Sequence, residues 1–476
     1  MNPQSHAFKH NVEAALDDVQ VQQALRNVGR GFVVKRRSAL DALPEFEALR
    51  VAARDIKGRT LARLAEHLER FEAAATQAGA QVHWARDAAE ACDIVVNLCR
   101  EAGAKRVAKG KSMVGEEIGI NPALEAAGFE PIETDLGEYI LQLAHEPPSH
   151  IIAPAIHKTR GQIADLFREA HRVHGLGEHL ETVPDIVNEA RQVLREQFLS
   201  ADVGITGANF LIAETGSTVI VTNEGNGDLS ATLPRTHIVT ASIEKVVPTL
   251  DDASVLLRLL ARSATGQETT AYTTFFTGPR RPEDAHGPEA FHIVLIDNGR
   301  SQMLGGEFHD MLRCIRCGAC LNHCPVYNTV GGHAYGWVYP GPMGSVLTPL
   351  MVGLAEGANL PNASTLCGRC EEVCPMSIPL PRMLRAHRIR EFETRLTPPR
   401  SRYALKAWAW LARRPRLYHR ILGPGMRLLG LLGRRQGRFR WLPLADAWTR
   451  ARDLPAPVGP SFMAQYRRTR REGTGS

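Results

Sequence analysis

The sequence predicts an α/β protein with four parts: N-terminal helices, a parallel α/β domain, a small cysteine-rich helical domain and a basic helical tail. Three observations support this order. Strand-like and helical segments alternate from residue 81, seven of the nine cysteines lie between Cys314 and Cys374, and the charge changes sign near residue 400. A chain of 476 residues is too long for one ordinary hydrophobic core and suggests two or three domains.

The first 75 residues are expected to be helical. Apolar residues recur at helical spacing in HNVEAALDDVQVQQALRNV and in DIKGRTLARLAEHLERFEAAATQAG, where Gly79 supplies a C-cap. Strand-like and helical segments then alternate, which is typical of a parallel sheet covered on both faces. The strand-like segments are QVHWA, RVAKGKS, FEPIETD and SHIIAPA, and the helical ones between them are DAAEACDIVVNLCREAGA and EEIGINPALEAAG.

The rest of this domain combines two helices with further strands. TRGQIADLFREAHRV and VPDIVNEARQVLREQFLSA have helical periodicity, and a β-rich passage follows from Val203 to Val247. FHIVLIDNGRSQ closes the domain near residue 300. We therefore predict N-terminal helices at 1–75, the α/β domain at 76–300, the cysteine-rich domain at 301–395 and the basic, tryptophan- and arginine-rich region at 396–476.

The charge distribution sets the C-terminal region apart. From Arg400 onward there are 18 basic and 3 acidic residues, which give the tail a charge of +15, whereas the 39 basic and 48 acidic residues before it give −9. Interleaved arginine and apolar residues suit docking on a partner, contact with a quinone-side acceptor, or the inner face of a membrane. A basic helix folded back on the acidic body is the alternative. Pro415 and Pro424 are expected to break this stretch into short helices.

We expect a cytoplasmic location for two reasons. The start MNPQSHAFKHNVEAALDDV has no apolar signal region, and no run approaches the roughly 18 apolar residues of a membrane-spanning helix. Reduced thiols would then be available to a metal. Because no helix-turn-helix or RNA-binding motif accompanies the basic tail, nucleic acid is not an expected partner.

The cysteine spacing is the most specific signal in the chain. Cys314, Cys317, Cys320 and Cys324, followed by Pro325, form the pattern C-x2-C-x2-C-x3-C-P. Zinc sites usually pair two short CxxC knuckles instead of this run, and a zinc ribbon is the alternative interpretation. The observed run is that of bacterial ferredoxins, in which three close thiolates bind one cluster and the fourth binds the other.

A second run, CGRCEEVCP, completes the assignment. We predict two 4Fe-4S clusters: cluster 1 at Cys314, Cys317, Cys320 and Cys374, and cluster 2 at Cys324, Cys367 and Cys370. A full second run would have a cysteine where this sequence has Ser364. The fourth corner of cluster 2 is therefore either missing, as in a 3Fe-4S cluster, or held by an oxygen ligand, a water or a partner protein.

The spacer and the cluster pair indicate a role in electron transfer. The 42 residues between Cys324 and Cys367 are too many for a minimal ferredoxin hairpin and resemble the helical ferredoxin of succinate dehydrogenases. Two clusters in one module form a path for single electrons between a donor and an acceptor. Purely structural clusters are the alternative.

The α/β domain offers candidate ligand loops but no complete catalytic constellation. Lys109, Lys111 and Ser112 lie where a strand ends before a helix, a common place for phosphate or carboxylate binding, although a solvated cationic face has the same pattern. Further candidates at glycine-rich turns are Glu214, Asn223 and Glu224. Such turns let backbone amides approach an anion or nucleotide, but they are also ordinary hairpin chemistry.

Other motifs give no cofactor. No GxGxxG follows a strand, no GxxxxGK[ST] is present, and no flavin motif is apparent, so a dinucleotide site and a P-loop have no support. Cys92 and Cys99, seven residues apart on a predicted helix, are expected to pack in the core.

A family resemblance adds to this reading. KGKSMVGEEIGIN, ETDLGEYILQLAHEPPSHIIAPAIHK, ADVGITGANFLIAETGSTVIVTNEGNG, LPRTHIV, DNGRSQMLG, CIRCGACLNHCPVY, GGHAYG and LCGRCEEVCP resemble the lactate-utilisation protein B family, in order from about residue 10 to 390. The resemblance implies a LUD-type α/β domain similar to CoA transferases and sugar-phosphate isomerases, followed by a dicluster ferredoxin domain. The family pattern also has seven cysteines and none at position 364.

The resemblance implies an iron-sulfur electron-transfer subunit of a complex that oxidises L-lactate to pyruvate. Its expected partners are A-like and C-like lactate-utilisation proteins. The chain shows no site for the first electron acceptor, so whether it is itself an enzyme stays open. The alternatives are an iron-sulfur oxidoreductase component for another 2-hydroxy acid such as glycolate, and an acyl- or nucleotide-handling α/β enzyme with redox clusters attached.

Overall fold

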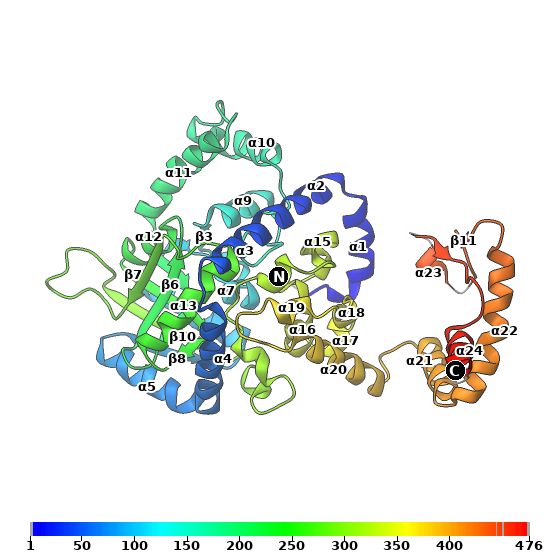
Figure 1. Ribbon diagram of the computed structural model, residues 1–476. Coiled ribbons are helices and arrows are strands. Elements are labelled where there is room, and N and C mark those ends of the chain that lie inside the picture. Colours follow the sequence, from blue (N-terminus) through cyan, green and yellow to red (C-terminus); the bar gives the residue numbers. More distant parts are fainter. Residues whose placement is uncertain (1–2, 444, 450–451, 474–476) are drawn as a thin grey trace. The chain divides into compact units, whose positions relative to one another are not determined.

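The computed structural model describes residues 3–443, 445–449 and 452–473. The chain divides into two compact units, Met1–Glu391 and Phe392–Ser476. The predicted fold class is confirmed: N-terminal helices lead into an α/β domain, a helical cysteine-rich region follows, and a helical tail ends the chain (Figure 1).

A six-stranded parallel sheet forms the centre of the α/β domain. Its strand order is β1-β10-β7-β4-β2-β3, and every neighbouring pair is parallel. The strands are β1 (Gln81–Ala85), β2 (Arg106–Lys109), β3 (Glu130–Glu133), β4 (Val203–Gly207), β7 (Thr236–Ser242) and β10 (Ala290–Ile296).

Helices cover both faces of this sheet, which explains why its central strands are almost continuously buried. In β10, Val294 and Ile296 pack in one core with helices α6 (Ala88–Glu101), α7 (Met113–Ile118) and α8 (Ile120–Ala126). The alternate residues Ile293 and Leu295 pack in a second core with α5 (Leu64–Gln77). Cys99 lies in the first of these cores, and the Cys92 thiol donates to the Ile118 carbonyl at 3.3 Å.

A smaller mixed sheet has the order β8-β5-β6-β9. Its strands are β5 (Phe210–Ile212), β6 (Ser217–Thr222), β8 (Val246–Val247) and β9 (Tyr272–Phe276). The remaining helices before residue 300 are η1 (Ser5–Ala7), α1 (Phe8–Asp17), α2 (Val19–Val28), η2 (Gly29–Val33), α3 (Val34–Asp41), α4 (Phe46–Ala62), α9 (Leu136–Ala144), α10 (Arg160–Ala170), η3 (His171–His174), α11 (Val183–Ser200), α12 (Asn226–Thr232), η4 (Ile243–Lys245) and α13 (Leu250–Ala264).

One strand prediction was wrong. SHIIAPA, residues 149–155, forms bends and turns instead of a strand. His150 Nδ1 accepts hydrogen bonds from the backbone amides of Ile152 and Ala153, both at 3.0 Å. This local capping turns the chain and takes up the amide groups that a strand would pair with its neighbour.

Short helices build the cysteine-rich region. They are η5 (Ser301–Met303), η6 (His309–Arg313), α14 (Ala319–Asn322), α15 (Tyr327–Val330), η7 (His333–Tyr335), α16 (Gly341–Met351), α17 (Leu354–Gly357), α18 (Asn359–Asn362), α19 (Arg369–Glu372) and α20 (Leu380–Glu393). Their apolar side chains share one continuous core with residues of α4, α13 and the smaller sheet, such as Leu256 and Val219. The region is therefore packed onto the α/β domain within the first unit.

A buried ionic network strengthens this contact. The Arg300 guanidinium donates to both carboxylate oxygens of Glu117 at 2.9 and 2.7 Å, and its Nε lies 2.8 Å from Glu244 Oε2. Tyr339, from the cysteine-rich region, donates its hydroxyl to Glu117 at 2.6 Å. Burial opposes ionisation of Glu244, but Arg300 and Arg316 lower its pKa to about 2. The network thus holds charged groups at the contact between the two regions.

The second unit is mainly helical and contains α21 (Pro399–Ala412), α22 (Pro415–Gly433), β11 (Arg438–Phe439), α23 (Asp446–Thr449), β12 (Leu454–Pro455) and α24 (Phe462–Gly473). The predicted break at Pro424 was wrong, since α22 continues through it. Pro424 lacks a backbone N–H and so removes one hydrogen bond of the helix, but the hydrogen bonds of the turns on either side keep the helix continuous. Among the helices of the described ranges, none is long and apolar enough to cross a membrane.

Candidate functional site

The structure brings the four cysteines predicted for cluster 1 around one small cavity. Cys314, Cys317, Cys320 and Cys374 line it together with apolar side chains such as Ile151 and Met343. Burial raises the pKa of Cys317 to about 12 and that of Cys374 to about 11. Cys314 and Cys320 are half-buried, whereas Cys317 and Cys374 are buried. Four sulfurs around one small cavity with an apolar wall are a donor set that fits an iron-sulfur cubane. Their binding of cluster 1 stays a prediction.

The three cysteines predicted for cluster 2 also share one neighbourhood. Burial raises the pKa of Cys370 to about 12, and repulsion from Cys324 and Cys367 adds to this shift. Cys367 is exposed, and a hydrogen bond from the backbone amide of Arg369 lowers the pKa of its thiol. The second thiol group is therefore closer to solvent than the first.

The two cysteine loops repeat the same backbone conformation. In the first loop Arg316 and Gly318 have positive φ angles of 59° and 73°, and fifty residues later Leu366 and Gly368 have φ angles of 53° and 84°. Each loop leads into a four-residue helix, α14 or α19. This correspondence pairs Ser364 with Cys314.

The side chains at the two paired positions make equivalent contacts. The backbone amide of Arg316 donates to Cys314 Sγ at 3.4 Å, and the backbone amide of Leu366 donates to Ser364 Oγ at 3.1 Å. Ser364 is half-buried. Its hydroxyl therefore has the same relation to its loop as the Cys314 sulfur has to the first loop.

A pocket of about 330 Å³ lies where strands β2, β4 and β7 end, the usual place for ligands in parallel α/β sheets. Four of the six predicted ligand residues line it: Lys111, Ser112, Asn223 and Glu224. Ser112 also caps α7 by accepting a hydrogen bond from the Gly115 amide at 3.0 Å. Burial and the nearby carboxylate of Asp135 raise the pKa of Glu224.

The other two predicted ligand residues lie elsewhere. Lys109 is fully buried and forms ion pairs with Glu116 at 2.8 Å and Glu133 at 2.6 Å, so its ammonium already has partners. Glu214 accepts a hydrogen bond from the backbone amide of Leu250 and does not line the pocket.

The sequence reading missed several pocket residues. They include Asn209, Thr240, Lys245 and Arg316. Arg316 lines both this pocket and the cavity of the first thiol group, and Ile151 does the same. The position of Arg316 between Cys314 and Cys317 was visible in the sequence, but no pattern indicated that the Arg316 side chain would reach the α/β domain. The pocket and the first thiol group therefore share a wall.

Comparison with known proteins agrees with this architecture. Residues 68–296 match the LUD domain and residues 310–378 match the 4Fe-4S dicluster domain. The fold and these two matches define the class of protein: an iron-sulfur protein with a LUD domain in front of a dicluster domain.

Full-length relatives give the family. The chain is 43% identical to lactate utilization protein B of Bacillus licheniformis, over 98% of this chain and 97% of the relative. It is 42% identical to lactate utilization protein B of Shouchella clausii, over 98% of both chains, and 41% identical to the uncharacterized electron transport protein YkgF of Escherichia coli, over 97% of this chain and 96% of the relative. The chain belongs to the lactate utilization protein B family.

A solved structure also aligns with part of the chain. It is a DUF162 family protein from Deinococcus radiodurans, aligned over 49% of this chain and 98% of its own with 14% identity and a TM-score of 0.27. A likeness of this size adds nothing to the assignment.

Proposed function

We propose that this protein is the iron-sulfur electron-transfer component of a complex that oxidises L-lactate to pyruvate. The names of its relatives and the dicluster region support this proposal. Oxidation of a 2-hydroxy acid to a 2-oxo acid releases two electrons and two protons. A pair of clusters can take up these electrons one at a time and pass them on.

The observation that carries the proposal is the wall shared by the pocket and the first thiol group. Arg316 and Ile151 line both cavities, so a redox-active group bound in the pocket would lie beside cluster 1. Lys111 and Arg316 offer cationic groups that suit a carboxylate. A three-carbon acid fills only part of the pocket, which leaves room for the group that first accepts its electrons.

The ligands of the two clusters form part of this proposal. Cluster 1 takes Cys314, Cys317, Cys320 and Cys374. Cluster 2 takes Cys324, Cys367 and Cys370, and the Ser364 hydroxyl stands at its fourth corner. The repeated loop conformation and the matching hydrogen bonds of Cys314 and Ser364 support this assignment. An oxygen ligand holds iron less firmly than a thiolate, so cluster 2 is the one expected to pass to a 3Fe-4S form in air.

Partner proteins complete the system. A-like and C-like lactate-utilisation proteins are the proposed subunits, and one of them supplies the first acceptor if the pocket does not. The second unit of the chain is the proposed docking element, because it exposes Trp408, Trp410 and Leu431 among many arginines. It would contact a partner or, at the inner face of the membrane, a quinone-side acceptor.

Substrate assays with the co-purified complex test the proposal. The complex should reduce an artificial acceptor with L-lactate, and more slowly with D-lactate or glycolate. Lys111→Met should raise the lactate concentration for half-maximal rate about 10-fold to 100-fold, as expected for loss of a charged hydrogen-bond donor. Lys105→Met is the matched control, since Lys105 is exposed at the opposite end of β2. Preference for glycolate would favour the alternative substrate, and equal effects of the two lysine substitutions would remove the pocket from the account.

A further inference from the structure

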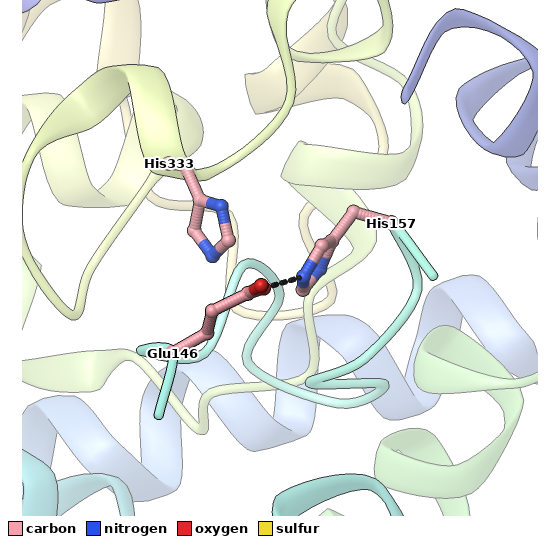
Figure 2. A group of neighbouring side chains, drawn as sticks. All are labelled: Glu146, His157 and His333. Atoms are coloured by element: carbon pink, nitrogen blue, oxygen red, sulfur yellow. Dashed lines mark hydrogen bonds and ion pairs between the residues drawn. The ribbon is translucent and has the colours of Figure 1, made fainter. Parts of the chain in front are cut away.

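Three potential metal ligands from separate parts of the first unit converge away from the cysteine clusters. Glu146 and His157 belong to the loop between α9 and α10, and His333 belongs to η7 in the cysteine-rich region. One ligand atom of each residue lies within 4.8 Å of the ligand atoms of the other two. Figure 2 shows the carboxylate and both imidazole rings turned toward one another.

Both ring nitrogens of His157 face oxygen atoms. Nδ1 lies 2.8 Å from the Ser149 hydroxyl, which also lies 3.2 Å from the Pro154 carbonyl oxygen. Nε2 lies 2.8 Å from Glu146 Oε2 and donates to it when this nitrogen carries the ring proton. With the proton on Nδ1 instead, donated to the Ser149 oxygen, Nε2 presents a lone pair beside the carboxylate. A metal ion that replaces the proton at Nε2 would therefore meet a nitrogen and an oxygen ligand side by side.

The carboxylate of Glu146 is held in position for such an ion. The Lys158 ammonium contacts one carboxylate oxygen, Oε1, and the other, Oε2, is directed at His157.

The third ligand adds a second imidazole and a nearby oxygen. The rings of His157 and His333 have centroids 4.4 Å apart, and His333 Nε2 lies 2.8 Å from the Pro147 carbonyl oxygen. An ion bound through this nitrogen would replace its proton, as binding of a metal to imidazole requires. Two imidazoles and one carboxylate are a donor set that suits Zn²⁺ and Fe²⁺ and leaves coordination positions open.

The surroundings have two further features of a metal site. The Ser149 hydroxyl orients His157 through the ring nitrogen that does not face the site, as outer partners of metal-binding histidines do. The side chain of His157 is 9% exposed and that of Glu146 is 34% exposed, so the carboxylate side is open to an entering ion.

We propose that Glu146, His157 and His333 bind one divalent transition-metal ion of the Zn²⁺ or Fe²⁺ type, separate from the two iron-sulfur clusters. The ion joins the α/β domain to the cysteine-rich region. The Ser149 carbonyl also accepts a hydrogen bond from the Tyr327 hydroxyl at 2.8 Å, and the Tyr327 amide lies 3.5 Å from Cys324 Sγ. The site therefore connects through two residues to the loop predicted to bind cluster 2.

Metal analysis of the full chain tests the proposal. Protein purified without oxygen should contain one equivalent of zinc, or of iron beyond the amount that matches its acid-labile sulfide. After mild chelation, competition with a chromogenic chelator should show that the protein rebinds one equivalent of added Zn²⁺ or Fe²⁺. The ion that binds with the higher affinity is the one assigned to the site. Glu146→Gln and His333→Gln should weaken this binding at least about 100-fold, and Ser149→Ala about 10-fold to 100-fold. The sulfide content should not change.

His83→Gln is the matched control. His83 Nε2 lies 3.2 Å from His292 Nδ1 in the same domain, but among the described residues this pair belongs to no three-ligand group. The control should bind Zn²⁺ and Fe²⁺ like the wild type. If the His333→Gln variant loses sulfide, the Glu146→Gln variant still tests the proposal, because the Glu146 side chain is partly exposed. Equal binding by wild type and Glu146→Gln, or no equivalent beyond the cluster iron and no rebinding, would overturn the proposal.

Discussion

Arg300 gives the sharpest prediction for stability. Its side chain is 1% exposed, makes two hydrogen bonds to Glu117 and forms an ion pair with Glu244. Arg300→Met would leave two buried carboxylates without their main cation. Tyr339 and Asn298 would still donate to Glu117, and Arg316 would remain 3.5 Å from Glu244. Loss of one partner of a buried ion pair typically costs about 3–5 kcal/mol.

This cost converts to a measurable change in melting temperature. If the 391 residues of the first unit unfold together, their unfolding entropy is about 0.8 kcal/mol per kelvin, and the predicted loss lowers the melting temperature by about 4–6 °C. Circular dichroism during heating, with oxygen excluded, measures it. Arg300→Met combined with Glu117→Gln should recover part of the loss, because one of the unpaired charges is then removed.

Arg235→Met is the control for this measurement. Arg235 contacts Glu289 Oε2 through two nitrogens at 3.1 and 2.7 Å, but its side chain is 81% exposed. Water and salt screen such a pair, so the melting temperature should hardly change. A similar decrease for the Arg300 and Arg235 variants would refute the reasoning that burial makes the Arg300 network important.

Three further predictions concern the clusters and the tail. Cys314→Ala should remove cluster 1 and about half of the bound iron by metal analysis, whereas Cys92→Ala should retain all of it; equal iron in both variants would contradict the ligand assignment. In air, the electron paramagnetic resonance signal of an oxidised 3Fe-4S cluster should be largest for Ser364→Ala, smaller for wild type and smallest for Ser364→Cys; no dependence on residue 364 would show that another ligand closes the corner. Deletion of residues 400–476 should keep iron and sulfide but weaken binding to the partner proteins or membranes in co-sedimentation; loss of the clusters would place the tail in the folded core.

Local patterns in the sequence predicted much of the fold. The alternation of strand-like and helical segments from residue 81 led to the parallel sheet, because it places helices on both faces of the sheet. The spacing of the cysteines predicted which of them bind each cluster, and the four assigned to cluster 1 line one cavity in the structure, although the ligand assignment itself stays a prediction. SHIIAPA failed because the side chain of His150 captures backbone amides, an interaction that periodicity does not report.

The candidate sites depend on contacts between distant segments and were only partly predictable. Lys109 and Lys111 are two residues apart, yet Lys109 ends the strand and is surrounded by carboxylates, whereas Lys111 lies beyond the strand end and lines the pocket. Arg316 reaches the pocket from the cysteine-rich region, and His333 meets Glu146 across 186 intervening positions of sequence. A single sequence gives no signal for such meetings, because they depend on how the two regions pack.

The central claim is that electrons from lactate pass through the clusters of this chain. Rapid mixing of the anaerobic co-purified complex with L-lactate, followed by freezing and electron paramagnetic resonance, tests it most directly. The account predicts that signals of reduced clusters develop at least as fast as pyruvate forms, and that the complex carrying Cys314→Ala loses electron flow to the external acceptor. Formation of pyruvate at the full rate while both clusters stay oxidised, or with cluster 1 removed, would contradict it.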